Sequence, residues 1–414
     1  MNMAILSLLI LVAVILIGFF RKVNVGLLAI LAATIFGSFI AFTDKKIIGG
    51  FSASLFIMLL GVSFLCSVAI SNSSLELLAQ KFLRLSGGHA VVAPFLIYII
   101  GFGIAAIGPG CVPALGIVAA LSLPLGQSTG YNPVMLAIIG EIGSFAGRFS
   151  PITPESVLIS GLAEPQGISG YQSSVLIYAT ITTIILSIVA FFFFKGYKVK
   201  GKIAKQETLP AFNINQILTL GGFVVVIIAS AFFKRNVGLI SFAVGIALVL
   251  IGAADEKQIF KSISWSTLLM VTGVGVFMSL VIEVGGVSAL SEGLSSVMNP
   301  TTAIAIQGFT AGIMSWFSSA IGVVWPTLVP TVGEIAKNVG VSANGLISIM
   351  CLSASFAGLS PASTGGALIM AAMASDPTFD KAQENKLFIE LFIVSGLMMG
   401  LIVLAALIGL YSIL

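Results

Sequence analysis

Charged side chains are scarce in this sequence. Only 8% of its 414 residues are Asp, Glu, Lys or Arg, whereas 58% are hydrophobic. Soluble domains carry about 25% charged residues, so the composition excludes an ordinary soluble domain, and we expect no nucleic-acid partner. Apolar stretches of about 20 residues recur along the chain and predict an all-α polytopic membrane protein embedded in a lipid bilayer.

Histidine and cysteine are almost absent. The single histidine, His89, falls in a loop, and Cys66, Cys111 and Cys351 lie far apart within apolar runs. The sequence has no cluster of His, Cys and carboxylate residues, so we expect neither a cofactor nor an enzyme built on metal ligands or a nucleophile–base pair. We interpret the three cysteines as small buried hydrophobic residues.

Aspartate is missing from the apolar stretches. Asp44, Asp255, Asp376 and Asp380 all fall in predicted loops. Proton antiporters usually need an acidic residue within the membrane, and aspartate is the usual one, so this absence counts against that class.

Two related stretches interrupt long apolar segments. SFAGRFSPITPESVLI begins at Ser144, and SFAGLSPASTGGALI begins at Ser355, 211 residues later (355 − 144). A proline inside a helix removes a backbone donor and breaks the helix. Membranes tolerate a broken helix only where it is buried in protein or lines a wet cavity. Paired breaks at matching positions of two halves are typical of a transporter's substrate site.

Two further apolar segments are interrupted near the middle. Residues 91–125 contain GPGCVP at 108–113, and residues 303–335 contain SSAIG at 318–322. The half-segments are too short to cross about 30 Å of hydrocarbon comfortably. We predict two re-entrant hairpins with tips at 108–111 and 318–322.

The chain is predicted to consist of two repeats. The first covers residues 1–194, a lysine-rich cytoplasmic linker covers 195–215, and the second repeat covers 216–414. Each repeat would hold five transmembrane helices, one of them broken, plus an interfacial helix and a hairpin. An odd number of spans inverts the second repeat in the membrane. The predicted unbroken spans are 4–20, 25–42, 54–70, 175–194, 217–233, 237–253, 266–284 and 387–411; the broken helices are 132–163 and 343–374; the interfacial helices are 71–84 and 287–294.

Basic residues predict the orientation. With the N-terminus outside, thirteen Lys and Arg residues fall on the cytoplasmic side and five outside. The positive-inside rule therefore places both termini outside and the linker in the cytoplasm, in a cell inner (plasma) membrane. We expect the first apolar stretch to be a retained helix rather than a cleaved signal peptide.

This plan of two five-helix repeats, each with a hairpin and a broken helix, resembles the ion transporter superfamily, which includes divalent-anion:sodium symporters, citrate carriers and arsenite permeases. The segment LGVSFLCSVAISNSSLELLAQKFLRLSGGH (60–89), with GPGCVPALG and SPITPES downstream, is most similar to malonate-type dicarboxylate carriers. The resemblance implies a homodimer and an elevator mechanism, in which hairpins and broken helices slide against a scaffold. The Ser-Asn-Thr motif of the symporter hairpin tips is absent here.

Breaks and hairpin tips expose backbone groups suited to ions. Half-helix N-termini favour a carboxylate, whereas unwound carbonyls and half-helix C-termini favour sodium. Alternatively, the hydroxyls there only satisfy backbone groups freed by the prolines. The predicted substrate-binding residues are Gly108, Pro109, Gly110, Cys111, Arg148, Ser150, Thr153, Ser318, Ser319, Ser360, Ser363 and Thr364, and the predicted sodium ligands are Gly110, Thr153, Gly322 and Ser363.

Arg148 is the one basic residue expected within the membrane. A charge at the helix centre costs on the order of 2.5–3.5 kcal/mol, so it needs a partner. It would bind a substrate carboxylate, or pair with Glu141 or Glu155, each seven residues away; the structural pair is the favoured alternative.

These features together predict a secondary active transporter of a small di- or tricarboxylate, taken up with sodium as the coupling ion. The alternatives are a proton-coupled or exchange carrier of an organic anion, and an oxyanion (arsenite-type) permease. A passive channel also uses hairpins and broken helices, but two inverted repeats favour alternating access.

Overall fold

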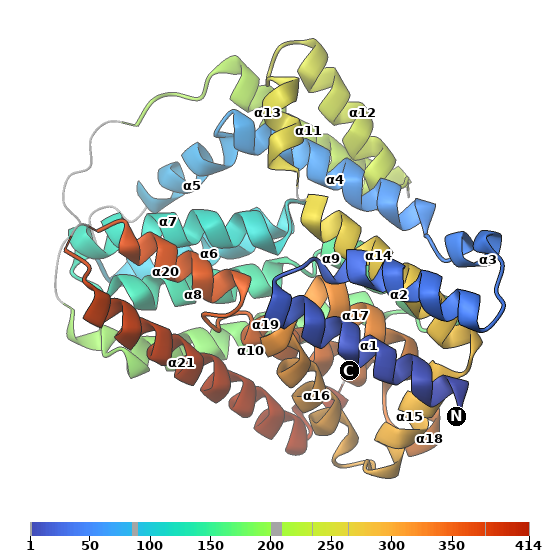
Figure 1. Cartoon of the computed structure of the whole chain (residues 1–414). Coiled ribbons are helices and arrows are strands. Elements are labelled where there is room, and N and C mark those ends of the chain that lie inside the picture. The colour runs from blue at the N-terminus through green and yellow to red at the C-terminus, as the bar shows by residue number, and fades with distance from the viewer. Residues whose placement is uncertain are drawn as a thin grey trace.

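The computed structural model describes residues 2–84, 90–199, 209–233, 235–263, 265–376 and 378–413. Regular structure in these ranges is entirely helical (Figure 1). His89, Lys200, Lys202, Lys205 and Lys234 lie outside the described residues. The predicted all-helical, polytopic membrane fold is confirmed.

The helices of the first half follow the predicted order. They are α1 (Met3–Arg21), α2 (Val25–Phe39), α3 (Asp44–Gly49), α4 (Ala53–Ser71), α5 (Ser74–Arg84), α6 (Ala93–Ala106), α7 (Cys111–Thr129), α8 (Pro133–Gly147), α9 (Pro154–Ala163) and α10 (Tyr171–Phe193). The predicted hairpin corresponds to α6 and α7, and the predicted broken helix to α8 and α9.

The second half repeats this order. Its helices are α11 (Ile214–Phe233), α12 (Val237–Leu250), α13 (Glu256–Ser262), α14 (Trp265–Glu283), α15 (Gly286–Ser296), α16 (Ala303–Phe317), α17 (Trp325–Leu328), α18 (Val332–Val339), α19 (Ala343–Ala357), α20 (Thr364–Ala374) and α21 (Lys381–Leu407). A π-helical turn at Ala320–Val324 precedes α17, and the two arms of this hairpin bend by 119°.

Helix lengths differ from the prediction in one respect. Six helices of the described chain are long and apolar enough to cross a membrane, or seven if the bent α16–α18 pair counts as one span. The two helices that follow α1 and α11 are shorter than predicted, since α2 has 15 residues and α12 has 14, or about 20 Å. Each is followed by a short helix, α3 or α13, that the sequence did not predict.

Glycine pairs join the two halves. A Cβ on Gly273 of α14 would lie 2.3 Å from the carbonyl oxygen of Gly26 in α2. A Cβ on Gly61 of α4 would lie 2.1 Å from the carbonyl oxygen of Gly238 in α12. Adding 212 to Gly26 and Gly61 gives Gly238 and Gly273, so each close contact maps onto the other. This reciprocity is what a two-fold relation between repeats produces.

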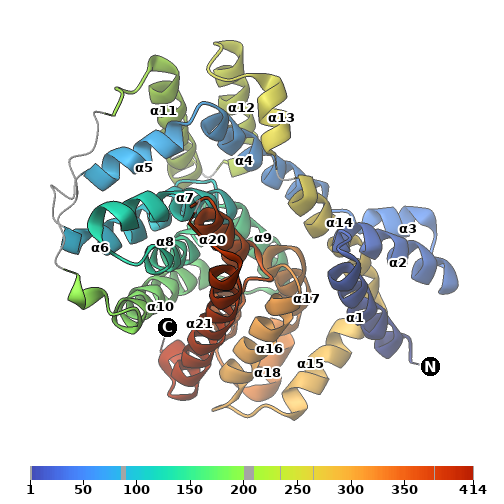
Figure 2. The same ribbon diagram turned by 60° about the vertical axis from the view of Figure 1, so that its left-hand side comes forward.

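The remaining helices form the body around the breaks. Helix α8 packs on α6, α7 and α10, while α19 packs on α16, α10 and α21. Figure 2 shows these helices gathered together, with α1 to α4 and α11 to α14 along their flank. Because both α8 and α19 lie inside this body, the two breaks at their C-terminal ends are largely enclosed by protein, as an interrupted membrane helix requires, with Pro151 and Ala362 as their exposed residues.

Candidate functional site

The first break runs from residue 148 to residue 153, between α8 and α9. Pro154 occupies the first turn of α9, and Thr153 caps that helix by accepting the Ser156 N–H at 3.2 Å. The Thr153 hydroxyl donates to the Arg148 carbonyl oxygen and also lies 2.9 Å from the Ser150 carbonyl oxygen. In this conformation the Thr153 hydroxyl serves backbone groups that the break releases.

The second break, residues 358–363, is less completely capped. Ser363 is the N-cap of α20 but makes no side-chain capping bond. The buried Ser360 hydroxyl accepts the Ala362 N–H at 3.3 Å, and Thr364 is exposed at the start of α20. In the first turn of α20 the Gly366 N–H donates to the Gly358 carbonyl at 3.1 Å, whereas the N–H groups of Thr364 and Gly365 make no backbone hydrogen bond among the described residues and can serve another acceptor.

Arg148 is buried beside the first break. Its Nη2 lies 3.3 Å from Oε1 of Glu155, and its Nη1 donates to the Ser355 hydroxyl of α19 at 3.2 Å. The guanidinium carbon lies 4.8 Å from the centre of the Trp325 ring, in the second hairpin. Of the two predicted partners, the structure pairs Arg148 with Glu155 rather than Glu141.

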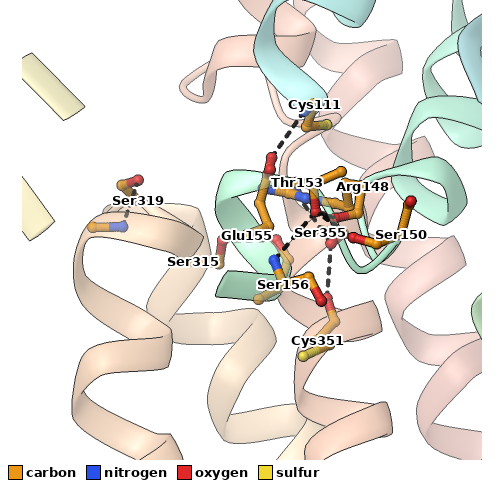
Figure 3. A network of polar contacts seen from close by, with 12 residues as sticks. Cys111, Arg148, Ser150, Thr153, Glu155, Ser156, Ser315, Ser319, Cys351 and Ser355 are labelled. Atoms are coloured by element: carbon orange, nitrogen blue, oxygen red, sulfur yellow. Dashed lines mark hydrogen bonds and ion pairs between the residues drawn. The ribbon is translucent and has the colours of Figure 1, made fainter. Parts of the chain in front are cut away.

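Glu155 extends this network to the first hairpin. Its Oε1 accepts the Cys111 N–H, the first backbone donor of α7, at 2.8 Å (Figure 3). Gly110 adopts φ +75°, and a Cβ there would lie 2.4 Å from Oε2 of Glu155. The Arg148–Glu155 pair thus connects both broken helices and both hairpins. Among the predicted site residues it brings together Gly110, Cys111, Arg148 and Thr153.

The tip of the second hairpin stands apart from this network. The Ser318 hydroxyl donates to the Met314 carbonyl at 2.7 Å, and the Ser319 hydroxyl accepts the Gly322 N–H at 3.1 Å. Figure 3 shows Ser319 away from Arg148. Gly322, a predicted sodium ligand, packs on Met270, whose Sδ would lie 2.1 Å from an added Cβ. The predicted sodium ligands therefore do not share one site: Gly110 and Thr153 lie by the Arg148 network, whereas Gly322 lies against Met270.

A cavity of about 60 Å³ lies next to the network. It is bounded by the first hairpin tip, the start of α9, Ile321 of the second hairpin, and helices α4 and α14. Sites for small molecules usually measure about 300–1,000 Å³, so this cavity is small for a bound substrate. Its side-chain lining includes Ser63, Ser67, Pro109, Glu155 and Thr267.

Glu141 forms a second buried acidic position. Its side chain is fully buried in α8, and neither carboxylate oxygen has a hydrogen-bond partner among the described residues. A Cβ on Gly365 would lie 2.5 Å from its Oε2, so the carboxylate lies against the first turn of α20. Glu141 therefore meets the second break from the opposite half.

Sequence reasoning missed two members of the network. Trp325 was not among the predicted site residues, yet it lies against the Arg148 guanidinium. Ser355 was not proposed as a site residue, although it occupies the position equivalent to Ser144 in the two related stretches. That equivalence was the available signal, because both serines lie one turn before a break.

Comparisons with known proteins agree with a membrane carrier. Residues 1–148 match the family described as the dicarboxylate carrier protein MatC N-terminus. No curated protein sequence matches this chain. The fold is similar to the YdaH transporter of Alcanivorax borkumensis, with a TM-score of 0.61 and 12% identity over 88% of each chain. It is also similar to Neisseria gonorrhoeae MtrF, with a TM-score of 0.59 and 13% identity over 89% of this chain and 83% of MtrF.

Proposed function

We propose that this protein is a secondary active transporter of a small di- or tricarboxylate anion. The observation that carries the proposal is the buried Arg148, which contacts Glu155, Ser355 and Trp325 and so joins the first break to α19 and to the second hairpin. A buried guanidinium beside helix N-termini offers charge and directed donors to a carboxylate. The MatC N-terminal match supports a dicarboxylate as the substrate class.

Sodium is the coupling ion in this proposal. Backbone carbonyls and hydroxyls at the breaks, including those at Thr153 and Ser363, are hard oxygen ligands of the kind that bind sodium in transporters with broken helices. Hairpins and broken helices would move as one domain against α1 to α4 and α11 to α14, within a homodimer. The substrate site would be exposed alternately on the two sides of the membrane.

A proton is the second candidate for the coupling ion. Glu141 is fully buried and its carboxylate has no hydrogen-bond partner among the described residues. Burying an unpaired carboxylate is costly, so a group in this position is suited to exchanging a proton as the protein changes conformation. MtrF is described as representing a class of antimetabolite efflux pumps, so loss of preloaded substrate from the liposomes is measured alongside the uptake described below.

The deciding experiment is transport by purified protein in liposomes. Labelled malonate, succinate and citrate are offered with a sodium gradient, with a pH gradient and with neither, and arsenite is included as the uncharged alternative. We expect the dicarboxylate to accumulate inside the liposomes to a concentration above that outside. This accumulation should require the sodium gradient. The contrary result is uptake that is independent of sodium, driven by the pH gradient and lost in Glu141→Gln. That result would identify a proton, and not sodium, as the coupling ion. Equilibration without accumulation under every gradient would indicate a channel.

A further inference from the structure

The Arg148 site already holds a carboxylate. Glu155 Oε1 lies 3.3 Å from the guanidinium and accepts the Cys111 N–H at 2.8 Å, with the side chain only 4% exposed. A charged side chain and a helix N-terminus are the two kinds of group that a substrate carboxylate would use here. Glu155 therefore occupies the place that the proposed function assigns to the substrate.

The pairing is incomplete. Arg148 Nε and Glu155 Oε2 are both buried without a hydrogen-bond partner in the described chain. Glu155 Oε1 receives both the guanidinium and the amide, so the bidentate arrangement that makes arginine–carboxylate pairs strong is absent. A carboxylate that used both oxygens would satisfy more of these donors than Glu155 does.

A displaced Glu155 has another place to go. It borders the cavity of about 60 Å³, together with Ser63 and Ser67 of α4 and Thr267 of α14. None of these three hydroxyls takes part in a hydrogen bond among the described residues. They are donors facing a space in which a carboxylate would find partners.

The second half lacks this acid. Gly365 occupies the position equivalent to Glu155, and α20 still begins after a break of the same kind. An acidic residue at this position is therefore not needed to form a break. The role of Glu155 is instead specific to the Arg148 site.

We propose, resting on the proposed function, that Glu155 is a tethered competitor for the Arg148 site and selects dicarboxylates over monocarboxylates. A side chain held beside the site acts at an effective concentration in the millimolar range or above. A monocarboxylate offers Arg148 only what Glu155 already provides. A dicarboxylate has a second carboxylate, which accepts the N–H groups of Thr364 and Gly365 at the start of α20, where Ser363 makes no side-chain capping bond, and this supplies the additional free energy that displaces Glu155. Glu155 thus provides selectivity by disfavouring the binding of monocarboxylates.

The test compares succinate with butyrate, which has the same chain length and one carboxylate. Binding to the purified protein is measured by calorimetry for wild type, Glu155→Gln and the control Glu164→Gln, an exposed glutamate at the end of α9. We expect Glu155→Gln to bind succinate at least about tenfold more tightly and to gain measurable butyrate binding. Glu164→Gln should match wild type. A folded Glu155→Gln that binds succinate no more tightly than wild type overturns the proposal.

A second variant tests the alternative position of Glu155. Ser67→Ala removes a donor from the cavity and should weaken succinate binding about three- to tenfold in wild type, but not in a Glu155→Gln background. Ser71→Ala, one turn further along α4 and outside the cavity, is its control. Unchanged succinate binding by Ser67→Ala contradicts the proposal even if Glu155→Gln does not fold. If wild type and Glu155→Gln both fail to bind any dicarboxylate, the proposed function fails as well.

Discussion

The Arg148 guanidinium and the Ser355 hydroxyl lie 3.2 Å apart although 207 residues separate them in the chain. Arg148 ends α8 at the first break, and Ser355 lies in the last turn of α19 before the second break. Ser355 also donates to the Cys351 carbonyl at 2.7 Å, so its oxygen is fixed toward the guanidinium. The two breaks are therefore held in one place by a bond between the repeats.

Removing Arg148 should destabilise the protein because Glu155 would remain buried without its countercharge. We expect Arg148→Gln to lower the free energy of unfolding by about 3–5 kcal/mol. Arg148→Gln combined with Glu155→Gln should recover most of that loss while transport stays absent. Thermal unfolding in detergent and liposome uptake measure the two effects separately.

The control for this prediction is the exposed pair Lys46–Glu283, whose side chains are 45% and 53% exposed at 2.8 Å separation. Lys46→Gln should change stability by at most about 1 kcal/mol. If Arg148→Gln is as stable as this control and only loses substrate affinity, the Glu155 pair is not structural and Arg148 acts solely as a ligand.

The two threonines at the breaks should behave differently. Thr153→Val removes the cap of α9 and should cost about 1 kcal/mol of stability. Thr364→Val removes an exposed hydroxyl that makes no hydrogen bond among the described residues, so stability should stay near wild type. If Thr364 contacts the ligand, transport falls about tenfold or more. Unchanged transport by a stable Thr364→Val would remove Thr364 from the substrate site.

Gly365 should not tolerate a side chain. A Cβ there would lie 2.5 Å from Oε2 of Glu141 and 2.8 Å from the Gly358 carbonyl oxygen. We expect Gly365→Ala to destabilise by about 1–3 kcal/mol, and Glu141→Ala to relieve part of that loss. Gly161→Ala is the matched control, since nothing lies within 4 Å of its Cβ in α9. Equal stability of the two alanine variants, measured by thermal unfolding, would contradict the close approach of Glu141 to α20.

Topology is tested with single cysteines on a background lacking the native three. Lys198, after α10, is predicted to be cytoplasmic and Lys337, on α18, to be outside; both side chains are exposed. An impermeant thiol reagent added to intact cells should label a cysteine at 337 and not one at 198. The opposite labelling would invert the orientation and exchange the sides from which the two hairpins enter.

Local sequence pattern is enough to locate the long helices and the two breaks, but not the short helices α3 and α13 or the C-terminal ends of α2 and α12. Apolar runs mark the spans, and Pro151, Pro154 and Pro361, together with the Ser and Thr residues beside them, mark the two interruptions, because a proline removes a backbone donor from its own turn. A proline alone is not sufficient, since Pro124 lies inside the continuous helix α7. The repeat was visible for the same reason, since the motif around each break is local in the chain.

Which residues share a site depends on how the helices pack against one another. Glu141 and Glu155 are equally distant from Arg148 along the chain, but the break redirects the chain so that Glu155 meets the guanidinium and Glu141 meets Gly365. Trp325 and Ser355 reach Arg148 because the helices of one half pack on those of the other. Such contacts depend on how helices approach one another, which local sequence pattern does not specify.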